Sequence, residues 1–288
     1  MQLSIKDTTI LESDSGAVKV IDIENSLRIT GLDSGDIVMV HSRLFSLGRV
    51  APGITKDYFT DLFIDTLLDV IGPEGTLIFP TFTFSTCKTG VFDVAKTGSE
   101  VGVLSERARH RKDSVRTLHP IFSVALFGKR IGTFQNASIN TCFGENSLFD
   151  LLHQLNSVGS DKGKVKFVTI GVDIPTEAVT YVHSIEEKMQ VPYRYNKNFQ
   201  CVVRADNKDF TSNVQFYVRD LSTDVVFDAN ACWNLLKTQD GVVTTRFGDS
   251  LIALLPEATV FNCLVSAIKE QSDFLCLGGY KVSNVQIV

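Results

Sequence analysis

Short apolar runs bounded by turn residues recur along the first two thirds of the chain. Residues 37–40, 76–79, 122–127 and 165–171 are rich in Val, Ile, Leu and Phe and show no polar alternation. Runs of this length between Gly, Pro, Asp and Ser are typical of strands buried on both faces. The pattern therefore predicts four strands in the core of the protein.

Helical periodicity separates these runs. After Thr55, which can cap a helix, the apolar residues Phe59, Leu62, Phe63, Leu67 and Val70 recur at helical spacing until Gly72-Pro73-Glu74-Gly75. Further helices are expected at 103–111, 148–155 and 181–189. Strand, helix and strand in this order predict a βαβ unit with a right-handed crossover. We therefore expect an α/β fold with a mixed, largely parallel central sheet flanked by helices.

The two ends of the chain show weaker patterns. Residues 1–25 alternate weakly, so they are expected to form a short hairpin or lead-in segment, and the core begins near Ser26. From 199 to 256, strand-like runs at 199–203, 214–218, 225–227, 242–247 and 251–255 surround a helix near 230–237. A final helix is expected at 259–271. We predict an α/β core (1–198), a smaller antiparallel β-rich lobe (199–257), and a C-terminal helix and tail (258–288).

Composition excludes several classes of protein. The net charge of −5 argues against a nucleic-acid binder, which needs a basic surface. No apolar run reaches the roughly 20 residues of a membrane helix. The six cysteines include no Cys-x-x-Cys pair and no signal peptide is apparent, so we expect reduced thiols in a soluble, cytoplasmic protein without membrane partners.

His183 and Glu186 are the first candidate catalytic residues. A spacing of three on a helix lets the carboxylate orient the imidazole and stabilise its protonated form. The same spacing also fits an ordinary surface ion pair. The choice depends on what surrounds them in the sequence.

Other site chemistries lack their motifs. There is no His-Glu-x-x-His or zinc-type cysteine spacing, so no metal ligands are expected. No Gly-x-Ser-x-Gly, Gly-x-Gly-x-x-Gly or Walker-type loop occurs. A basic run at 107–116 could meet phosphates, and it fits a solvated helix face equally well.

Six segments together resemble the aminoglycoside 3-N-acetyltransferase-like family. They are His41-Ser42-Arg43-Leu44-Phe45-Ser46-Leu47-Gly48, Gly72-Pro73-Glu74-Gly75-Thr76-Leu77, Pro80-Thr81-Phe82-Thr83, Leu118-His119-Pro120, Phe143-Gly144-Glu145-Asn146-Ser147 and Thr180-Tyr181-Val182-His183-Ser184-Ile185-Glu186-Glu187. They occur in the family's order between about 31 and 195. The resemblance implies an α/β fold distinct from the GCN5-related acetyltransferase fold.

The resemblance implies direct transfer of an acyl group from acyl-CoA, either acetyl or longer, to an amine on a sugar. His183 matches the general base and Glu186 its orienting carboxylate. The residues that the resemblance places near CoA are His41, Ser42, Thr81, His119 and Ser123, with Arg109 and Arg116 for its phosphates. Alternatives stay open: Ser42 and Thr81 could cap turns, and His119 could be a packed residue before a strand.

The acceptor is predicted from a departure from the family. Where aminoglycoside-modifying members usually carry an Ala-Glu-Tyr-Arg-Ala type sequence, this chain has Ser184-Ile185-Glu186-Glu187-Lys188 and then Val191-Pro192-Tyr193-Arg194-Tyr195. Arg194, Lys197 and two tyrosines favour an anionic acceptor. We therefore expect Thr180, Glu187, Tyr193 and Arg194 to bind a dTDP-linked 3-amino-3,6-dideoxyhexose used in surface-polysaccharide synthesis.

Two alternative functions remain open from the sequence. One is an aminoglycoside 3-N-acetyltransferase, and the other is a non-catalytic protein that binds acyl-CoA or a sugar nucleotide. Acyl-CoA and a small amino sugar are the expected partners. A homodimer is an open alternative to a monomer.

Overall fold

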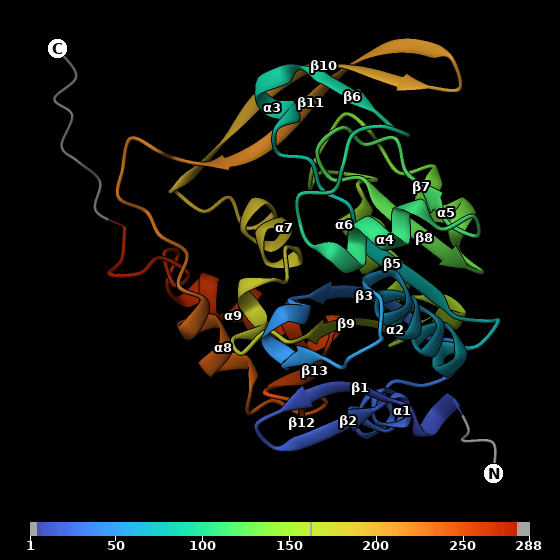
Figure 1. The fold of residues 1–288 in the computed structure, drawn as a ribbon. Helices are drawn as coiled ribbons and strands as arrows, with labels where there is room; N and C mark the ends of the chain where they lie inside the picture. Colours follow the sequence, from blue (N-terminus) through green and yellow to red (C-terminus); the bar gives the residue numbers. More distant parts are fainter. Residues whose placement is uncertain (1–4, 162, 281–288) are drawn as a thin grey trace, which may run out of the picture.

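A computed structural model describes residues 5–161 and 163–280, built around a seven-stranded sheet (Figure 1). Its strand order is β12 (Val243–Phe247), β13 (Ser250–Pro256), β9 (Val165–Ile170), β3 (Ile37–Ser42), β5 (Thr76–Pro80), β8 (Val124–Gly128) and β7 (Val115–Arg116). β9, β3 and β5 pair in parallel, and the outer pairs are antiparallel. β13 and β8 thus run against the other five, which is the mixed, largely parallel sheet that the sequence predicts.

The sheet divides the core into two hydrophobic clusters. Along β3, Ile37 and Met39 belong to one cluster, and Val38 and Val40 belong to the other. Successive side chains of a strand point to opposite faces, so a strand covered on both sides reads as an unbroken apolar run. This arrangement explains why the four runs are so visible in the sequence.

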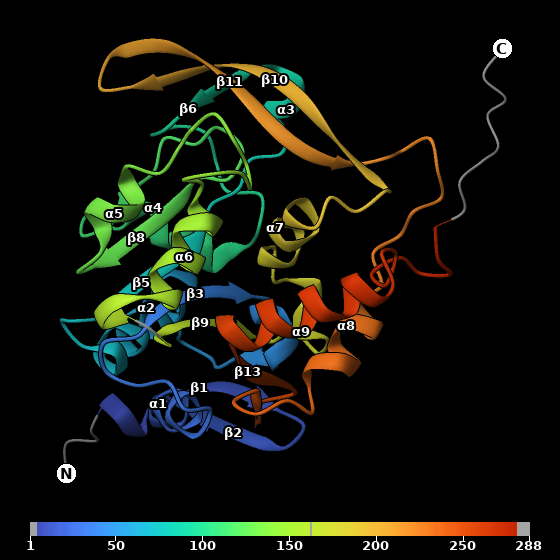
Figure 2. The same ribbon diagram turned by 180° about the vertical axis from the view of Figure 1, so that it is seen from behind.

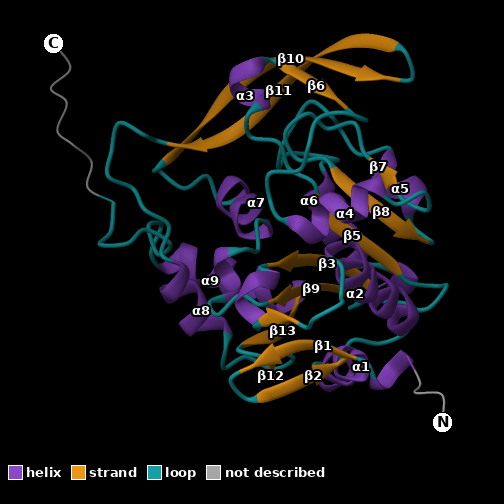
Figure 3. Ribbon diagram, in the orientation of Figure 1, coloured by secondary structure: helices purple, strands orange, loops and turns teal. Residues whose placement is uncertain are grey.

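One face is covered by α1 (Val20–Ile29), α2 (Lys56–Ile71) and α4 (Val103–His110). A small sheet of β1 (Thr9–Ser13), β2 (Gly16–Lys19) and β4 (Arg49–Val50) lies beside α1, at the bottom of the view in Figure 3. The hairpin predicted in the N-terminal segment is therefore confirmed as β1–β2. The segment 20–25 was wrongly predicted as part of the lead-in, because α1 already begins at Val20. Residues 1–4 lie outside the described residues.

The other face is covered by the later helices: α5 (Ile131–Gln135), α6 (Leu148–Ser157), α7 (Tyr181–Lys188), α8 (Ala229–Leu236) and α9 (Glu257–Glu270). The predicted caps of α2 and α6 form, since Thr55 accepts from Tyr58 N and Ser147 accepts from Asp150 N. Short 3₁₀ turns at Ile5–Asp7, Leu44–Leu47, Gly159–Asp161 and Pro175–Glu177 complete the connections.

A long hairpin lies across one end of the molecule. β10 (Arg194–Ala205) and β11 (Lys208–Arg219) pair along their whole length, and β6 (Val91–Asp93), which follows α3 (Thr86–Thr89), joins β10 in parallel. Both views place α7 between this hairpin and α8 and α9 (Figures 1 and 2). The hairpin thus covers the helix that carries His183.

The strands predicted between 199 and 256 separate into two sheets. Those at 199–203 and 214–218 lie within the hairpin, whereas β12 and β13 extend the central sheet. The predicted strand at 225–227 is wrong, because only Phe227 forms an isolated bridge, to Cys276. The division into a core, a lobe and a C-terminal segment stays a prediction.

Candidate active site

His183 and Glu186 are brought together by one turn of α7. His183 Nδ1 lies 2.6 Å from Glu186 Oε2. The Glu186 side chain is only 1% exposed, whereas that of His183 is 28% exposed. The carboxylate is therefore fixed in the core, and the imidazole extends from it toward solvent.

Two further side chains hold the Glu186 carboxylate. Tyr193 donates its hydroxyl to Oε1 at 2.8 Å, and Arg194 Nε lies 2.9 Å from Oε2. Burial opposes ionisation of Glu186, but His183, Arg194 and Tyr193 outweigh it and keep its pKa below the ordinary value. Glu186 is therefore a carboxylate at neutral pH.

This carboxylate determines the tautomer of His183. With Nδ1–H donating to Glu186, Nε2 is left as the nitrogen that can accept a proton. Arg194 Nη2 also lies 2.9 Å from Nδ1, but it cannot donate there while Nδ1 carries its own proton. We assign Nδ1–H to Glu186 because that contact is shorter and involves a full negative charge.

His183 lines a large cavity of about 1170 Å³ between α7, the end of β3 and the hairpin. Thr180, His41 and Ser42 line the same cavity. Burial lowers the pKa of His41 to about 3, so its imidazole is neutral, and its Nε2 has no hydrogen-bond partner. Gly171, where the chain leaves β9, fixes this end of the sheet, because a Cβ there would lie 2.4 Å from Arg43 O.

Thr81, Ser123 and Arg116 form a buried polar network away from this cavity. The hydroxyls of Thr81 and Ser123 lie 3.0 Å apart, and Arg116 donates to Ser123 Oγ and to the Thr81 carbonyl. Arg116 also donates to the carbonyls of Val94 and Thr97. Burial lowers its pKa to about 10. None of the three predicted CoA contacts lines either of the two described cavities.

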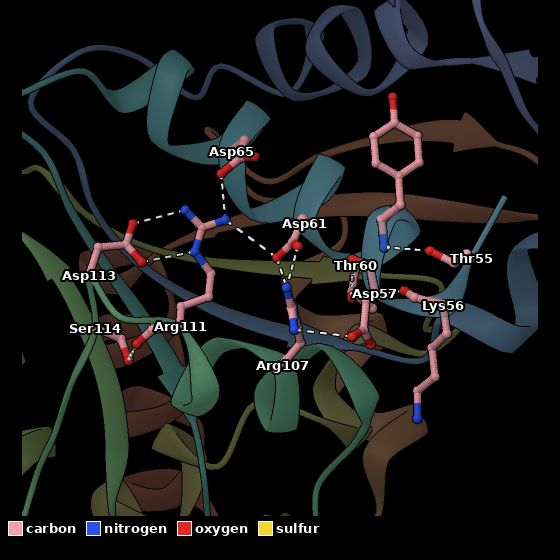
Figure 4. Close-up of polar contacts among 11 residues, drawn as sticks. Thr55, Lys56, Asp57, Thr60, Asp61, Asp65, Arg107, Arg111, Asp113 and Ser114 are labelled. Carbon is pink, nitrogen blue, oxygen red and sulfur yellow. Dashed lines mark hydrogen bonds and ion pairs between the residues drawn. The ribbon is translucent and has the colours of Figure 1, made fainter.

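Three further arginines of the basic run are engaged in ion pairs. Arg109 binds both oxygens of Glu106 and the Ala95 carbonyl, and its side chain is 7% exposed. Arg107 and Arg111 reach across to carboxylates of α2, and both contact Asp61 (Figure 4). The run therefore joins α4 to α2. Arg109 is not presented to a phosphate, which favours the reading of the run as a helix face.

His119 is a packed residue, which was the alternative left open by the sequence. Its Nδ1 accepts from the backbone of Ile121 and Phe122, and its Nε2 lies 3.1 Å from the Thr141 carbonyl. Burial lowers its pKa to about 4. The ring fixes the turn that precedes β8.

A smaller cavity of about 420 Å³ lies on the neighbouring side of α7. Glu187 lines it one helical turn beyond His183, together with Glu145, Asp150 and Lys188. Glu187 Oε2 is buried without a hydrogen-bond partner, and burial raises the pKa of this carboxyl to about 6. Three carboxyl groups and one ammonium group therefore line this cavity.

The family model for aminoglycoside 3-N-acetyltransferase matches residues 39–269. The chain belongs to the aminoglycoside 3-N-acetyltransferase family. The predicted family, and with it the predicted enzyme class of N-acyltransferase, is confirmed.

Two curated members of the family are similar in sequence. Aminoglycoside N(3)-acetyltransferase VII of Streptomyces paromomycinus is 24% identical over 226 residues, which cover 70% of this chain and 72% of that one. Aminoglycoside N(3)-acetyltransferase IX of Micromonospora chalcea is 36% identical over 76 residues, and this match covers 26% of this chain and only 25% of that one.

Solved structures share the fold. AAC-IIIb in its binary complex with CoASH superposes with a TM-score of 0.69 at 18% identity, covering 88% of this chain and 97% of that chain. Sisomicin-bound AAC-VIa superposes with a TM-score of 0.71 at 18% identity, covering 88% and 98%. The predicted fold class, distinct from the GCN5-related fold, is confirmed.

Two arginines of this acetyltransferase-family chain were missed by sequence reasoning. Arg43 and Arg219 both line the large cavity. Arg43 directly follows β3, and this position after the end of a strand could have identified it as a site residue. Its guanidinium pairs with Glu177 at 3.5 Å. Arg219 gave no local signal, because only the hairpin register places it opposite Arg194.

The cysteines do not line the two cavities. All six lie in the described part of the chain, all are free, and none lines either cavity. Burial raises the pKa of each thiol, that of Cys87 to about 11. A protonated, buried thiol is a poor nucleophile, so a cysteine acyl-enzyme is disfavoured.

The described residues contain neither a metal-binding cluster nor a membrane-spanning helix. Within 5–161 and 163–280, no group of three or more His, Cys, Asp or Glu side chains is placed to hold a metal ion. In the same part of the chain, no helix has the length and apolar character needed to cross a membrane.

Proposed function

We propose that this protein transfers an acyl group from acyl-CoA to an amino group of an aminoglycoside by direct transfer. The observation that carries the proposal is the His183–Glu186 pair. A buried carboxylate fixes Nδ1, and the imidazole opens on the large cavity, in which we place the acyl-CoA donor. This is the arrangement that a general base requires.

His183 takes the proton of the attacking amine on Nε2. The C–N bond of the amide forms, the thioester C–S bond breaks, and the proton passes from His183 to the departing thiolate. Glu186 stays ionised and stabilises the imidazolium between these two transfers. Because Glu186 is already held by Tyr193 and Arg194, the pair needs no rearrangement during the reaction.

The large cavity supplies groups suited to the CoA donor. Ser42 and the neutral His41 line it and are available as hydrogen-bond donors to the thioester oxygen. Arg43 and Arg219 replace Arg109 and Arg116 as our candidates for the CoA phosphates, because only the first two line the cavity.

The acid-lined smaller cavity supports a polycationic acceptor. Glu187 lies one turn from His183 with an unpartnered oxygen, and Glu145 and Asp150 line the same space. Ammonium groups of an aminoglycoside complement these carboxylates. The names of the relatives, including a sisomicin-bound structure, agree with this acceptor class.

The nucleotide-linked acceptor expected from the sequence has less support than an aminoglycoside. Arg194 lines the large cavity but is already paired with Glu186, and Tyr193 is 1% exposed with its hydroxyl on the same carboxylate. Lys197 lies over the Phe199 ring, and neither it nor Tyr195 lines a described cavity. A homodimer stays an open alternative, and the cytoplasmic location stays a prediction.

A thiol-release assay tests the proposal. Acetyl-CoA is supplied with a panel of aminoglycosides and, separately, with a dTDP-linked 3-amino-3,6-dideoxyhexose, with acceptor-free hydrolysis as the baseline. We expect acceptor-dependent release of CoA with aminoglycosides, and mass spectrometry should find one added acyl group per acceptor. Turnover confined to the nucleotide sugar would overturn the acceptor assignment, and none with either would overturn the catalytic one.

A further inference from the structure

The most exposed large hydrophobic side chain in the described residues lies at the mouth of the large cavity. Phe45 lines this cavity and is 84% exposed. Within 5–161 and 163–280, its ring pairs with no other aromatic ring and with no cationic side chain. An isolated apolar residue on a surface is common and needs no ligand to explain it. The significance of Phe45 therefore depends on how it is held and on what surrounds it.

Phe45 projects from a turn that is fixed at both ends. It belongs to the 3₁₀ turn Leu44–Leu47, whose first and last side chains are buried. Just before the turn, Arg43 N donates to Ile170 O at 2.8 Å, and Asp249 N donates to the last carbonyl of the turn at 3.0 Å. Because the backbone is anchored on both sides, a ligand that covers the ring does not have to order the turn that carries it.

The two most exposed apolar side chains of the mouth are each accompanied by an arginine. Arg43 lies two residues before Phe45, and Arg219 lies two residues before Leu221, which is 78% exposed. All four line the large cavity, one pair from the turn after β3 and the other from the end of β11. The contact of Arg43 with Glu177 is 3.5 Å long and half exposed, so it contributes little and leaves the guanidinium available.

This combination matches the nucleotide end of the donor. The thioester lies beside His183 inside the cavity, so the other end of CoA, an adenine with its phosphates, lies toward the mouth. A purine stacks on an exposed aromatic face, and phosphates beside it pair with guanidinium groups. The pantetheine arm between the two ends has neither a flat ring nor a charge.

We propose that Phe45 stacks on the adenine ring of acyl-CoA and so fixes the nucleotide end of the donor at the cavity mouth. The inference rests on the proposed function, because that function places the thioester beside His183. Phe45 takes no part in making or breaking bonds. It determines which donor is bound, and it favours acyl-CoA over an acyl group carried on phosphopantetheine without a nucleotide.

Calorimetry with CoA and with 4′-phosphopantetheine, which lacks the adenosine 3′-phosphate, tests this role. The ratio of the phosphopantetheine Kd to the CoA Kd measures what the nucleotide contributes to binding. Phe45→Ala should lower this ratio by about 5- to 150-fold, the range expected for loss of one stacked base. The change should come from the Kd of CoA, whereas the Kd of phosphopantetheine should stay the same. Phe45→Trp should keep the ratio, because it retains an aromatic face.

Two controls separate stacking from indirect effects. Val158→Ala should leave both Kd values unchanged, because Val158 is 69% exposed and lines neither described cavity. Ionic strength distinguishes the ring from the neighbouring arginine. The effect of Phe45→Ala on the Kd of CoA should be equal at low and high salt, whereas that of Arg43→Gln should shrink as salt screens the phosphates.

Thermal unfolding establishes that each variant folds. If Phe45→Ala does not, Phe45→Leu replaces it, and it should also lower the ratio because leucine has no aromatic face. An unchanged ratio in the folded variants, or an equal rise in both Kd values, would overturn the inference while leaving CoA binding intact. Absence of CoA binding by the wild type would instead contradict the proposed function.

Discussion

The molecule contains two histidine–glutamate pairs of the same construction, and they face different surroundings. In one, His183 Nδ1 meets Glu186, whose other oxygen accepts from Tyr193. In the other, His153 Nδ1 lies 2.8 Å from Glu257 Oε1, which also accepts from Tyr181. Both glutamates are 1% exposed, and the two histidines are 23–28% exposed.

The two pairs differ in the space that adjoins the imidazole ring. His183 opens on the large cavity, whereas His153 lines only the smaller one, where its ring stacks on Phe261 with centroids 4.0 Å apart and an interplanar angle of 25°. The His153 pair also joins α6 to the start of α9. A buried carboxylate that orients a histidine is therefore insufficient to define a base. The space offered to a reacting group decides between catalysis and structure.

Replacing each of the two histidines with alanine should give the largest difference in kcat between the two pairs. His183→Ala should lower kcat by about 10²–10⁴-fold, the usual contribution of a positioned general base. His153→Ala should keep kcat within about threefold, because His153 lines the smaller cavity and not the large cavity in which the thioester is placed. Steady-state thiol release measures both, with circular dichroism as the folding control. Equal losses in the two variants would show that the cavity does not distinguish them.

Replacing the two glutamates should separate activity from stability. Glu186→Gln should lower kcat by about tenfold or more, since the imidazolium loses its counter-charge. Glu257→Gln should leave kcat nearly unchanged but lower the free energy of unfolding by about 1–3 kcal/mol, because His153, Tyr181 and Asn156 all donate to this carboxylate. Urea denaturation and the thiol assay together measure both effects. A kcat loss specific to Glu257→Gln would reverse our assignment.

Glu187→Gln should have the smallest effect on stability, and this effect should depend on pH. Burial raises the Glu187 pKa from 4.5 to about 6, so folding favours its protonated form. The resulting loss of stability is absent below the unfolded pKa and develops as pH rises through about 6. The variant should therefore be more stable than the wild type at pH 8, by about 1 kcal/mol once partial exposure is allowed for, and equally stable near pH 4.

The same variant should bind aminoglycosides less well. Above pH 6 its KM should rise several-fold over the wild type, and the two should converge at lower pH, where Glu187 is already protonated. Thermal unfolding is measured from pH 4 to 8, and KM from pH 5 to 8. A KM difference that does not depend on pH would remove Glu187 from the acceptor site.

The sequence predicts the central strands and helices because each is buried on a regular face. It predicts the His183–Glu186 pair for the same reason, since the spacing and the helix are local properties. The partners of Arg116, the carbonyls of Thr81, Val94 and Thr97, become visible only when loops fold back, whereas the partner of Arg109, Glu106, lies three residues earlier on the same helix. Charge along a sequence does not reveal which charges are already neutralised.

Long-range register accounts for the remaining differences. Arg219 reaches the cavity only because β10 and β11 pair in a register that sets it opposite Arg194. β13 joins the central sheet by pairing with β9, some 80 residues earlier in the chain, and β12 joins it by pairing with β13. Short-range patterns identify such strands as strands but do not say which sheet they enter.

The hairpin of β10 and β11 has one end at the active-site glutamate and the other at a distant turn. Its first residue, Arg194, contacts Glu186, while β10 ends eleven residues later at Ala205, roughly 36 Å away at the usual rise of a strand, just before the turn at Asp206 and Asn207. Insertions or substitutions at that tip leave the pairing at the base unchanged. Evolution, or a protein engineer, can therefore remodel the far end of the hairpin without disturbing the carboxylate that sets the base.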